Sequence, residues 1–201
     1  MKHLLVLHSC SEMLGLGIRP LDAPGADRLA CFPLGRRLAN ELLSSVEQML
    51  PASQWHLLGR LVVATGPGGF TATRLTVVLA RTLAQQLSIP LHGVSGFQLA
   101  GVRLGLDAPT WLCQDLPGRG RVAGLYGPDS AALGSVREFQ PPRLFATGCS
   151  LPPGPQLSGQ PLLPADLETM LALGIEAEQR RLAGPWPEVL PIYPTSPVAD
   201  R

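Results

Sequence analysis

The segment best suited to chemistry is a glycine-rich turn, Gly66-Pro67-Gly68-Gly69-Phe70-Thr71, between an apolar run and an amphipathic segment. Glycines between a strand and a helix let backbone N–H groups face an anion at the helix N-terminus, where the helix dipole favours negative charge. The turn departs from the dinucleotide pattern G-x-G-x-x-G, because Thr71 stands at the third glycine position, and it lacks the Gly-Lys-Ser/Thr ending of a Walker loop. We therefore favour a tight structural turn and keep anion binding open as the alternative.

Candidate nucleophiles and metal ligands are scattered along the chain. Gly93-Val94-Ser95-Gly96-Phe97 nearly spells G-x-S-x-G, but Phe97 replaces the last glycine, so Ser95 is expected to cap a helix. None of the 4 histidines has a partner at ligand spacing, and none of the 4 cysteines belongs to a C-x-x-C pair. Lys2 is the only lysine. We predict no catalytic residue, no metal site and no lysine-based mechanism.

The composition indicates a folded domain of modest charge. The 201 residues are 45% hydrophobic and 15% charged, with a net charge of +1, which argues against disorder and against a nucleic-acid-binding surface over the whole molecule. No apolar run approaches the roughly 20 residues that cross a bilayer, and the start of the chain does not read as a signal peptide. Unpaired cysteines fit a reducing compartment, so we expect a cytoplasmic protein that does not enter a membrane.

The hydrophobic pattern predicts an α/β fold with a partly parallel sheet. Strands are expected at 3–8, 14–18, 29–32, 61–65 and 91–95, with a hairpin joining the first two and helices at 36–50, 73–87 and 96–102. Beyond residue 105 the pattern weakens, with strands at 110–113, 121–126 and 143–146, an irregular stretch at 151–164, and a helix from Asp166, as its cap, to about 182. We accordingly divide the chain into 1–104, with the main sheet and helices, and 105–201, a smaller and irregular lobe.

The helices at 36–50 and 73–87 carry more apolar surface than one sheet face can cover. In the first, the apolar side chains fall within an arc of about 140°, namely Leu38, Ala39, Leu42, Leu43, Val46, Met49 and Leu50. In the second, only a stripe with Arg74, Arg81, Gln85 and Ser88 and a few single positions are polar. A helix on a sheet needs an apolar stripe of only about 100°. The surplus is covered either by the rest of this chain or by a partner.

Residues 61–100 resemble a family signature, G-x-G-P-G-S-F-T-G-L-R…A-x-x-L-A…I-P-L-x-G-V-S. The matching segments are Ala64-Thr65-Gly66-Pro67-Gly68-Gly69-Phe70-Thr71-Ala72-Thr73-Arg74-Leu75, Ala80, Leu83-Ala84 and Ile89-Pro90-Leu91-His92-Gly93-Val94-Ser95. This is the signature of TsaB (YeaZ-like) proteins, the partner subunit of the bacterial tRNA threonylcarbamoyladenosine synthase. The family loop corresponds here to Gly66, Pro67, Gly68, Gly69, Phe70 and Thr71, followed by Arg74.

The resemblance implies an actin/Hsp70/sugar-kinase-like (ribonuclease H-like) fold of two related lobes, the second reduced. It implies a non-catalytic subunit that binds and activates the catalytic paralogue TsaD, with TsaE as the ATPase, tRNA contacted indirectly, and ATP and metal held by the partner subunits. A homodimer of the isolated chain is also compatible with it. Pairing in the family uses helices on the first lobe, which places Leu42, Val46, Leu75, Val78 and Leu79 at or beneath the expected interface.

Several positions depart from the family pattern and indicate a divergent member. The opening Asp-Thr-Ser-Thr reads His8-Ser9-Cys10-Ser11, so a carboxylate that active relatives of this fold use near Mg-phosphate is absent. His-Ser-Glu reads Leu38-Ala39-Asn40, glycine replaces serine at 69, and Ala72-Thr73 replace Gly-Leu. The ending Val189-Leu190-Pro191-Ile192-Tyr193 resembles the family's P-x-Y, with Thr195 in place of arginine. The alternative function is an ATP-dependent, small-molecule kinase-like enzyme of the same fold that uses the 66–71 loop for phosphate.

Overall fold

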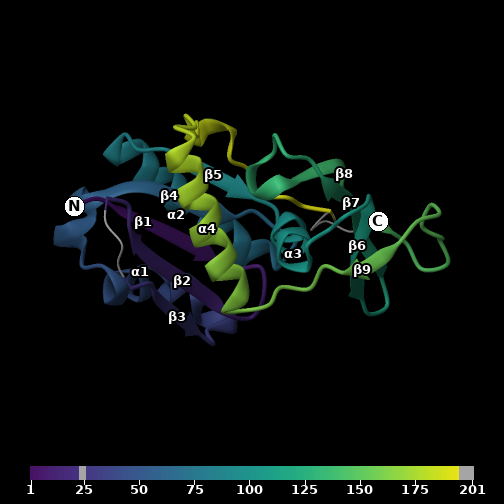
Figure 1. Cartoon of the computed structure of the whole chain (residues 1–201). Coiled ribbons are helices and arrows are strands. Elements are labelled where there is room, and N and C mark those ends of the chain that lie inside the picture. Colours follow the sequence, from purple (N-terminus) through teal and green to yellow (C-terminus); the bar gives the residue numbers. More distant parts are fainter. Residues whose placement is uncertain (23–25, 195–201) are drawn as a thin grey trace.

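The computed structural model describes residues 1–22 and 26–194, which form two neighbouring sheets with helices around them (Figure 1). The first sheet has 5 strands in the order β3-β2-β1-β4-β5. Its strands are β1 (His3–His8), β2 (Leu14–Pro20), β3 (Arg28–Phe32), β4 (Leu58–Ala64) and β5 (Leu91–Val94). β1, β2 and β3 pair antiparallel, whereas β1, β4 and β5 pair parallel, so the predicted hairpin and partly parallel sheet are both present.

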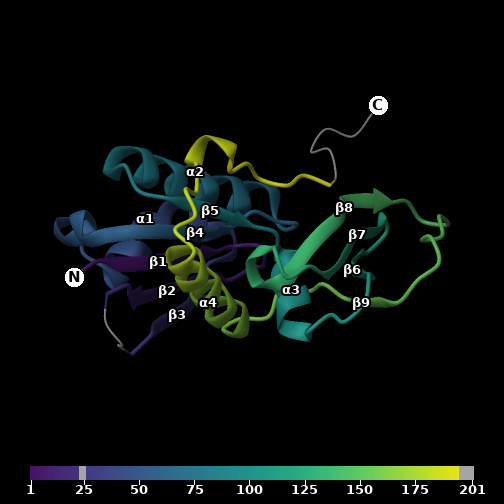
Figure 2. The same ribbon diagram turned by 45° about the horizontal axis from the view of Figure 1, so that its top comes forward.

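Helices cover both faces of this sheet, with α1 (Leu38–Met49) and α2 (Phe70–Leu87) on one face and α4 (Ala165–Gln179) on the other (Figure 2). β1 is buried on both sides because its side chains alternate between the two layers. Leu5 and Leu7 belong to the core beneath α1 and α2, and Leu4 and Val6 belong to the core beneath α4. The apolar run of the first strand is thus explained by a double-sided sheet.

The second sheet has 4 strands in the order β8-β7-β6-β9. They are β6 (Thr110–Leu116), β7 (Gly120–Pro128), β8 (Val136–Phe145) and β9 (Gln156–Ser158), and α3 (Gly96–Leu104) packs against this sheet and against α4. Short 3-10 turns lie at Gly35–Arg37, Ala52–Leu57, Leu133–Ser135 and Trp186–Glu188. The expected boundary at 104/105 falls between α3 and β6, while α4, from the second half of the chain, returns to the first sheet (Figure 1).

Some expected boundaries are wrong for local physical reasons. α2 begins at Phe70 instead of residue 73, because Gly69 takes the extended cap conformation directly after the turn. Asp166 is not the cap of α4 but lies inside its first turn, where its carboxylate accepts a 2.6 Å hydrogen bond from the Leu162 N–H. β8 begins at Val136, well before the expected 143, and the irregular stretch at 151–164 contains the short edge strand β9.

The segment after α4 ties the first sheet to the glycine-rich turn. The Leu91 N–H donates to the Gly184 carbonyl at 2.9 Å, and the Ile192 N–H donates to the Thr65 carbonyl at 2.7 Å. The buried Arg60 of β4 donates to Glu178 of α4 and contacts His92 of β5. Thr195, noted above for its departure from the family ending, lies outside the described residues.

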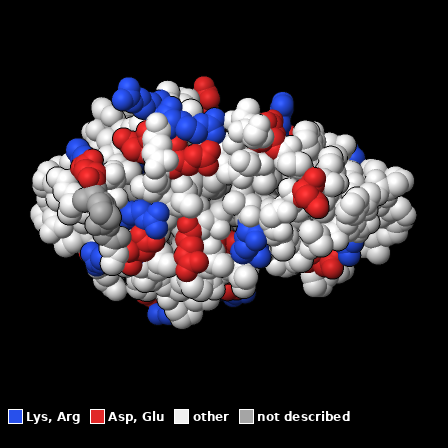
Figure 3. Space-filling model, in the orientation of Figure 1, with Lys and Arg blue, Asp and Glu red and all other residues white. Residues whose placement is uncertain are grey.

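On the face that carries α4, basic and acidic side chains are interspersed and do not form a patch of one sign (Figure 3). Ion pairs between neighbouring groups, such as Arg180 with Glu176 at 2.8 Å, contribute to this mixture. Within residues 1–22 and 26–194, none of the helices combines the length and the apolar character that a membrane span requires.

Candidate partner interface

The glycine-rich turn is a packed structural element. Gly66 has a φ of +114°, which side chains rarely adopt, and its bond to Pro67 is cis. A Cβ at position 68 would lie 2.5 Å from the Cys10 Cα, so the turn and the end of β1 touch backbone to backbone. The Gly66 carbonyl accepts hydrogen bonds from the Gly96 N–H at 2.6 Å and from the Ser95 hydroxyl at 3.4 Å. These contacts account for the glycines at 66 and 68 without a ligand, in line with the structural interpretation.

The groups at the end of β1 are buried and unreactive. Burial lowers the pKa of His8 to about 4 despite the carboxylate of Asp166, whose Oδ2 lies 3.9 Å from the His8 Nε2. Burial also raises the pKa of the Cys10 thiol to about 12, so it carries no thiolate at neutral pH. Across the part of the chain that the structure describes, no group of three or more His, Cys, Asp and Glu side chains could hold a metal ion.

Helix α1 buries most of its predicted apolar arc, but the buried face is shifted at one edge. The buried residues are Leu38, Leu42, Ser45, Val46 and Met49. Ser45 was expected outside the apolar arc, but its hydroxyl donates to the Glu41 carbonyl at 2.7 Å and can therefore be buried without an unpaired polar group. Leu43, expected inside the arc, is 50% exposed, and Ala39 is exposed one turn earlier. The helix is rotated so that this apolar edge faces solvent.

Helix α2 likewise buries one side and leaves apolar atoms on the other. Its buried residues are Thr73, Thr76, Val77, Ala80, Leu83 and Ala84. Thr76 is accommodated because its hydroxyl donates to the Ala72 carbonyl at 3.1 Å. Val78 is 50% exposed. Leu75 and Leu79 are half-buried and pack against the core cluster that α1 and α2 share. The surplus apolar surface that the sequence predicts is therefore partly open to solvent.

The five predicted interface residues lie at different depths. Leu42 and Val46 are inside the chain's own core, at 7% and 0% exposure, beneath the surface of α1. Leu75 and Leu79 are half-buried on α2, and Val78 is the most exposed of the five, at 50%. Two exposed apolar residues were not among the predicted interface residues, namely Leu43 on α1 and Phe70 at the start of α2. The Phe70 ring contacts the Tyr193 ring, with the two centroids 4.5 Å apart. Arg74 is exposed on α2.

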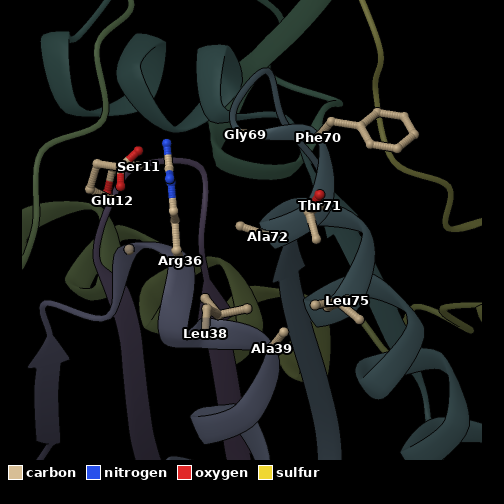
Figure 4. Close-up of a pocket in the computed structure, with 11 residues that line it drawn as sticks. Ser11, Glu12, Arg36, Leu38, Ala39, Gly69, Phe70, Thr71, Ala72 and Leu75 are labelled. Carbon is tan, nitrogen blue, oxygen red and sulfur yellow. The ribbon is translucent and has the colours of Figure 1, made fainter. Parts of the chain in front are cut away.

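A cavity of about 360 Å³ lies where α1 and α2 begin. Its wall comprises Ser11, Glu12, Gly35, Arg36, Leu38, Ala39, Gly69, Phe70, Thr71, Ala72 and Leu75. Figure 4 shows Leu38 and Ala39 on one side and Ala72 and Leu75 on the other. Arg36 extends from the 3-10 turn just before α1 toward Ser11 and Glu12 (Figure 4). Sequence reasoning missed this cavity because it lies between two helices that are adjacent only in the folded chain.

Together, the two neighbouring sheets, the glycine-rich turn and the helices α1 and α2 make up a YeaZ-like fold. Two solved structures of YeaZ or a YeaZ-like protein from Pseudomonas aeruginosa share it. The alignment with the first spans 97% of this chain and 100% of the other chain, with a TM-score of 0.68 and 18% sequence identity. The other covers 96% and 100% at a TM-score of 0.64 and 17% identity. The YeaZ-like α/β fold expected from the resemblance is confirmed.

Sequence comparisons point in the same direction. A family model described as TsaD, tRNA N6-adenosine threonylcarbamoyltransferase, matches residues 34–111. The tRNA threonylcarbamoyladenosine biosynthesis protein TsaB of Bacillus subtilis (strain 168) is 49% identical over 41 residues, which are 20% of this chain and 18% of that protein. An uncharacterized protein of Mycobacterium leprae (strain TN) is 30% identical over 112 residues, 51% of this chain and 30% of that protein. The matched segments thus span less than a third of these curated relatives, and the resemblance to TsaB (YeaZ-like) proteins is confirmed.

Proposed function

We propose that this chain is a TsaB-type subunit that acts in the cytoplasm in tRNA threonylcarbamoyladenosine modification. In this proposal it binds and activates a TsaD-like catalytic paralogue and performs no catalysis itself. The partner subunits, including a TsaE-like ATPase, hold the ATP and the metal, and the tRNA contacts this chain only indirectly. The fold and the sequence similarity to TsaB support the proposal, and so does the burial of His8 where active relatives of the fold use a carboxylate.

The observation that carries the proposal is the exposed apolar strip along α1 and α2, which we call the helix seam and define as Ala39, Leu43, Leu75, Val78 and Leu79. Leu43 and Val78 are each 50% exposed, so about half of each residue's surface is open to solvent. Stable heterodimers bury about 800 Å² on each partner, and the surface of two neighbouring helices is a suitable platform for such an area. A related fold on the partner would offer the same kind of helix pair.

Activation by a subunit of this type requires that it bind one conformation of the catalytic subunit better than the other. The helix seam is suited to this role, because the underlying leucines and valines fix α1 and α2 firmly on the sheet. Leu42, Val46, Val77 and Ala80 are all buried in one core, so the two helices present a surface with little freedom to adapt. A rigid surface favours the one conformation of the partner that fits it, because it does not deform to fit the other.

The test is co-expression of this chain with the TsaD-like protein of the same organism, followed by co-purification and assay of tRNA modification. The expected result is a complex, with modification that depends on this chain. Leu43→Arg should weaken the complex by about tenfold or more, because a charge would be placed in the apolar seam. Leu157→Arg is the matched control, since Leu157 is 44% exposed on β9, away from the seam. Failure of the wild-type chain to bind the TsaD-like protein would contradict the proposal.

A further inference from the structure

The cavity at the start of α1 and α2 is lined by several of the residues that depart from the family signature. Ser11, Leu38, Ala39, Gly69 and Ala72 come from three separate segments of the chain, each differs from the signature, and all five line this one cavity. At positions 38, 39, 69 and 72 the residues found here are apolar side chains or glycine. These five changes therefore alter the chemistry of one site.

The inner wall of the cavity is continuous with the helix seam. Residues three and four apart are neighbours on a helix surface, so Ala39 leads to Leu43 on α1 and Leu75 leads to Val78 and Leu79 on α2. Leu43 and Val78 are the most exposed of these, each at 50%. A partner that covers the seam would thus also lie over the cavity.

The rim of the cavity favours a negatively charged neighbour. Arg36 is exposed at the rim, and among the ion pairs of residues 1–22 and 26–194 none includes it. The first turn of α2, which also faces the cavity, contains no acidic residue, and Gly69 provides no side-chain cap. The unpaired N–H groups of that turn add partial positive charge. Glu12 is the single carboxylate of the wall.

We propose that this cavity is a socket for an apolar side chain of the partner subunit, with an adjacent carboxylate of the partner placed against Arg36. This inference rests on the proposed function and adds the chemistry that selects the partner. Leu38, Ala39, Ala72 and Leu75 would surround the apolar side chain, and Arg36 would pair with the acid beside it. A TsaD-like protein with a polar or basic side chain at that point would leave an unpaired group in an apolar wall and bind more weakly.

The first test fills the socket. Ala72→Leu and Ala39→Leu add side-chain volume to the wall, and each should lower the affinity for the partner by about tenfold, as blocking a central anchor does at other interfaces. Ala131→Leu is the matched control, because Ala131 is exposed in the turn before the 3-10 turn at Leu133–Ser135. Thermal unfolding of each variant verifies that the fold is retained. Two socket variants that unfold like the wild type and bind within about twofold of it would overturn the proposal.

The second test examines the charge. Arg36→Glu should slow association and reduce the affinity about tenfold at low salt, with a smaller difference at high salt, because rim charges act mainly on the on-rate. Arg28→Glu is the control, since Arg28 is also exposed, lies on β3 and forms no ion pair within the described residues. Equal effects of the two substitutions would contradict the role of Arg36.

The third test identifies the occupant directly. A photo-crosslinking diazirine amino acid at position 39, in the complex with the partner, should form its cross-link at an apolar residue within about two positions of an Asp or Glu. Cross-links confined to a basic or uncharged polar segment would overturn the proposal. If the wild type forms the complex and Leu43→Arg disrupts it while the socket variants do not, the socket is wrong and the proposed function stands. If the wild type forms no complex, the proposed function itself fails.

Discussion

The glycine-rich turn makes a sharp prediction about two adjacent glycines. A Cβ at position 68 would meet the Cys10 Cα at 2.5 Å and the Cys10 carbonyl oxygen at 2.7 Å, both backbone atoms. At position 69 the nearest atom to an added Cβ would be the Ala72 Cβ, at 3.9 Å, which is an ordinary contact. Gly68→Ala should therefore destabilise the fold, whereas Gly69→Ala should be nearly neutral.

The size of the effect follows from how firmly the turn is held. The Gly66 carbonyl is bonded to the Gly96 N–H at 2.6 Å, and the Thr65 carbonyl is bonded to the Ile192 N–H at 2.7 Å, so the turn cannot move away without loss of these bonds. Overpacking of a tight contact costs about 1–3 kcal/mol. With an m value of about 2 kcal/mol per M of urea, this range lowers the unfolding midpoint by about 0.5–1.5 M.

The assay is equilibrium unfolding in urea, followed by tryptophan fluorescence and circular dichroism on both variants and the wild type. Gly68→Ala should also weaken the complex with the partner, because a shifted turn displaces the start of α2 and with it one wall of the socket. An unchanged midpoint for Gly68→Ala, or an equal loss for Gly69→Ala, would refute the reasoning that Gly68 is required by its contact with Cys10.

Three further predictions follow from particular contacts. Gly69→Ser should raise the free energy of unfolding by about 0.5 kcal/mol in the same urea assay. Gly69 has the extended conformation of a helix N-cap, and a serine there would supply the missing side-chain hydrogen bond to the helix. A loss of stability would contradict this prediction. Tyr126→Phe should lower the free energy of unfolding by about 1–2 kcal/mol, because the buried Tyr126 hydroxyl donates to Glu138 at 2.6 Å and shares a 3.0 Å hydrogen bond with Ser95. Tyr193→Phe is the control and should change it little, since Tyr193 is 40% exposed. Stability should fall as the pH drops from about 6.5 to about 4, because burial lowers the pKa of both His8 and His92 to about 4 and the unfolded chain then binds more protons than the folded one. His8→Asn should flatten that part of the stability–pH profile, and an unchanged slope would show that His8 is not its source.

Local sequence was sufficient to predict those elements whose residue pattern depends only on residues close by in the chain. The hairpin of β1 and β2, the apolar strand β4 and the glycine-rich turn were all predicted within a few residues, because alternation and glycine clusters act over short distances. The similarity to TsaB extended this to the two-lobed fold, since the signature lies on the strand, turn and helix that its core is built around.

The rotation of the helices was decided by long-range packing. Leu43 and Ser45 exchange their expected environments because α1 is positioned by β2 and α2, and a serine that bonds its own helix can be buried while a leucine is left outside. The start of β8 was missed because its exposed residues do not alternate cleanly. The buried Asp166 accepts a hydrogen bond from the partly exposed Arg103 at 2.9 Å, which joins α4 to α3 across a separation that no local pattern reveals.

The amino-acid sequence by itself determined the order of strands and helices, the turn and the excess of apolar side chains on two helices, since each depends on residues within one or two turns. Only the tertiary structure decided which of those side chains remain exposed and that residues from three separate segments enclose a cavity between the helix starts. Burial and cavities depend on the surfaces that pack together, and those surfaces are brought into contact only when the whole chain folds.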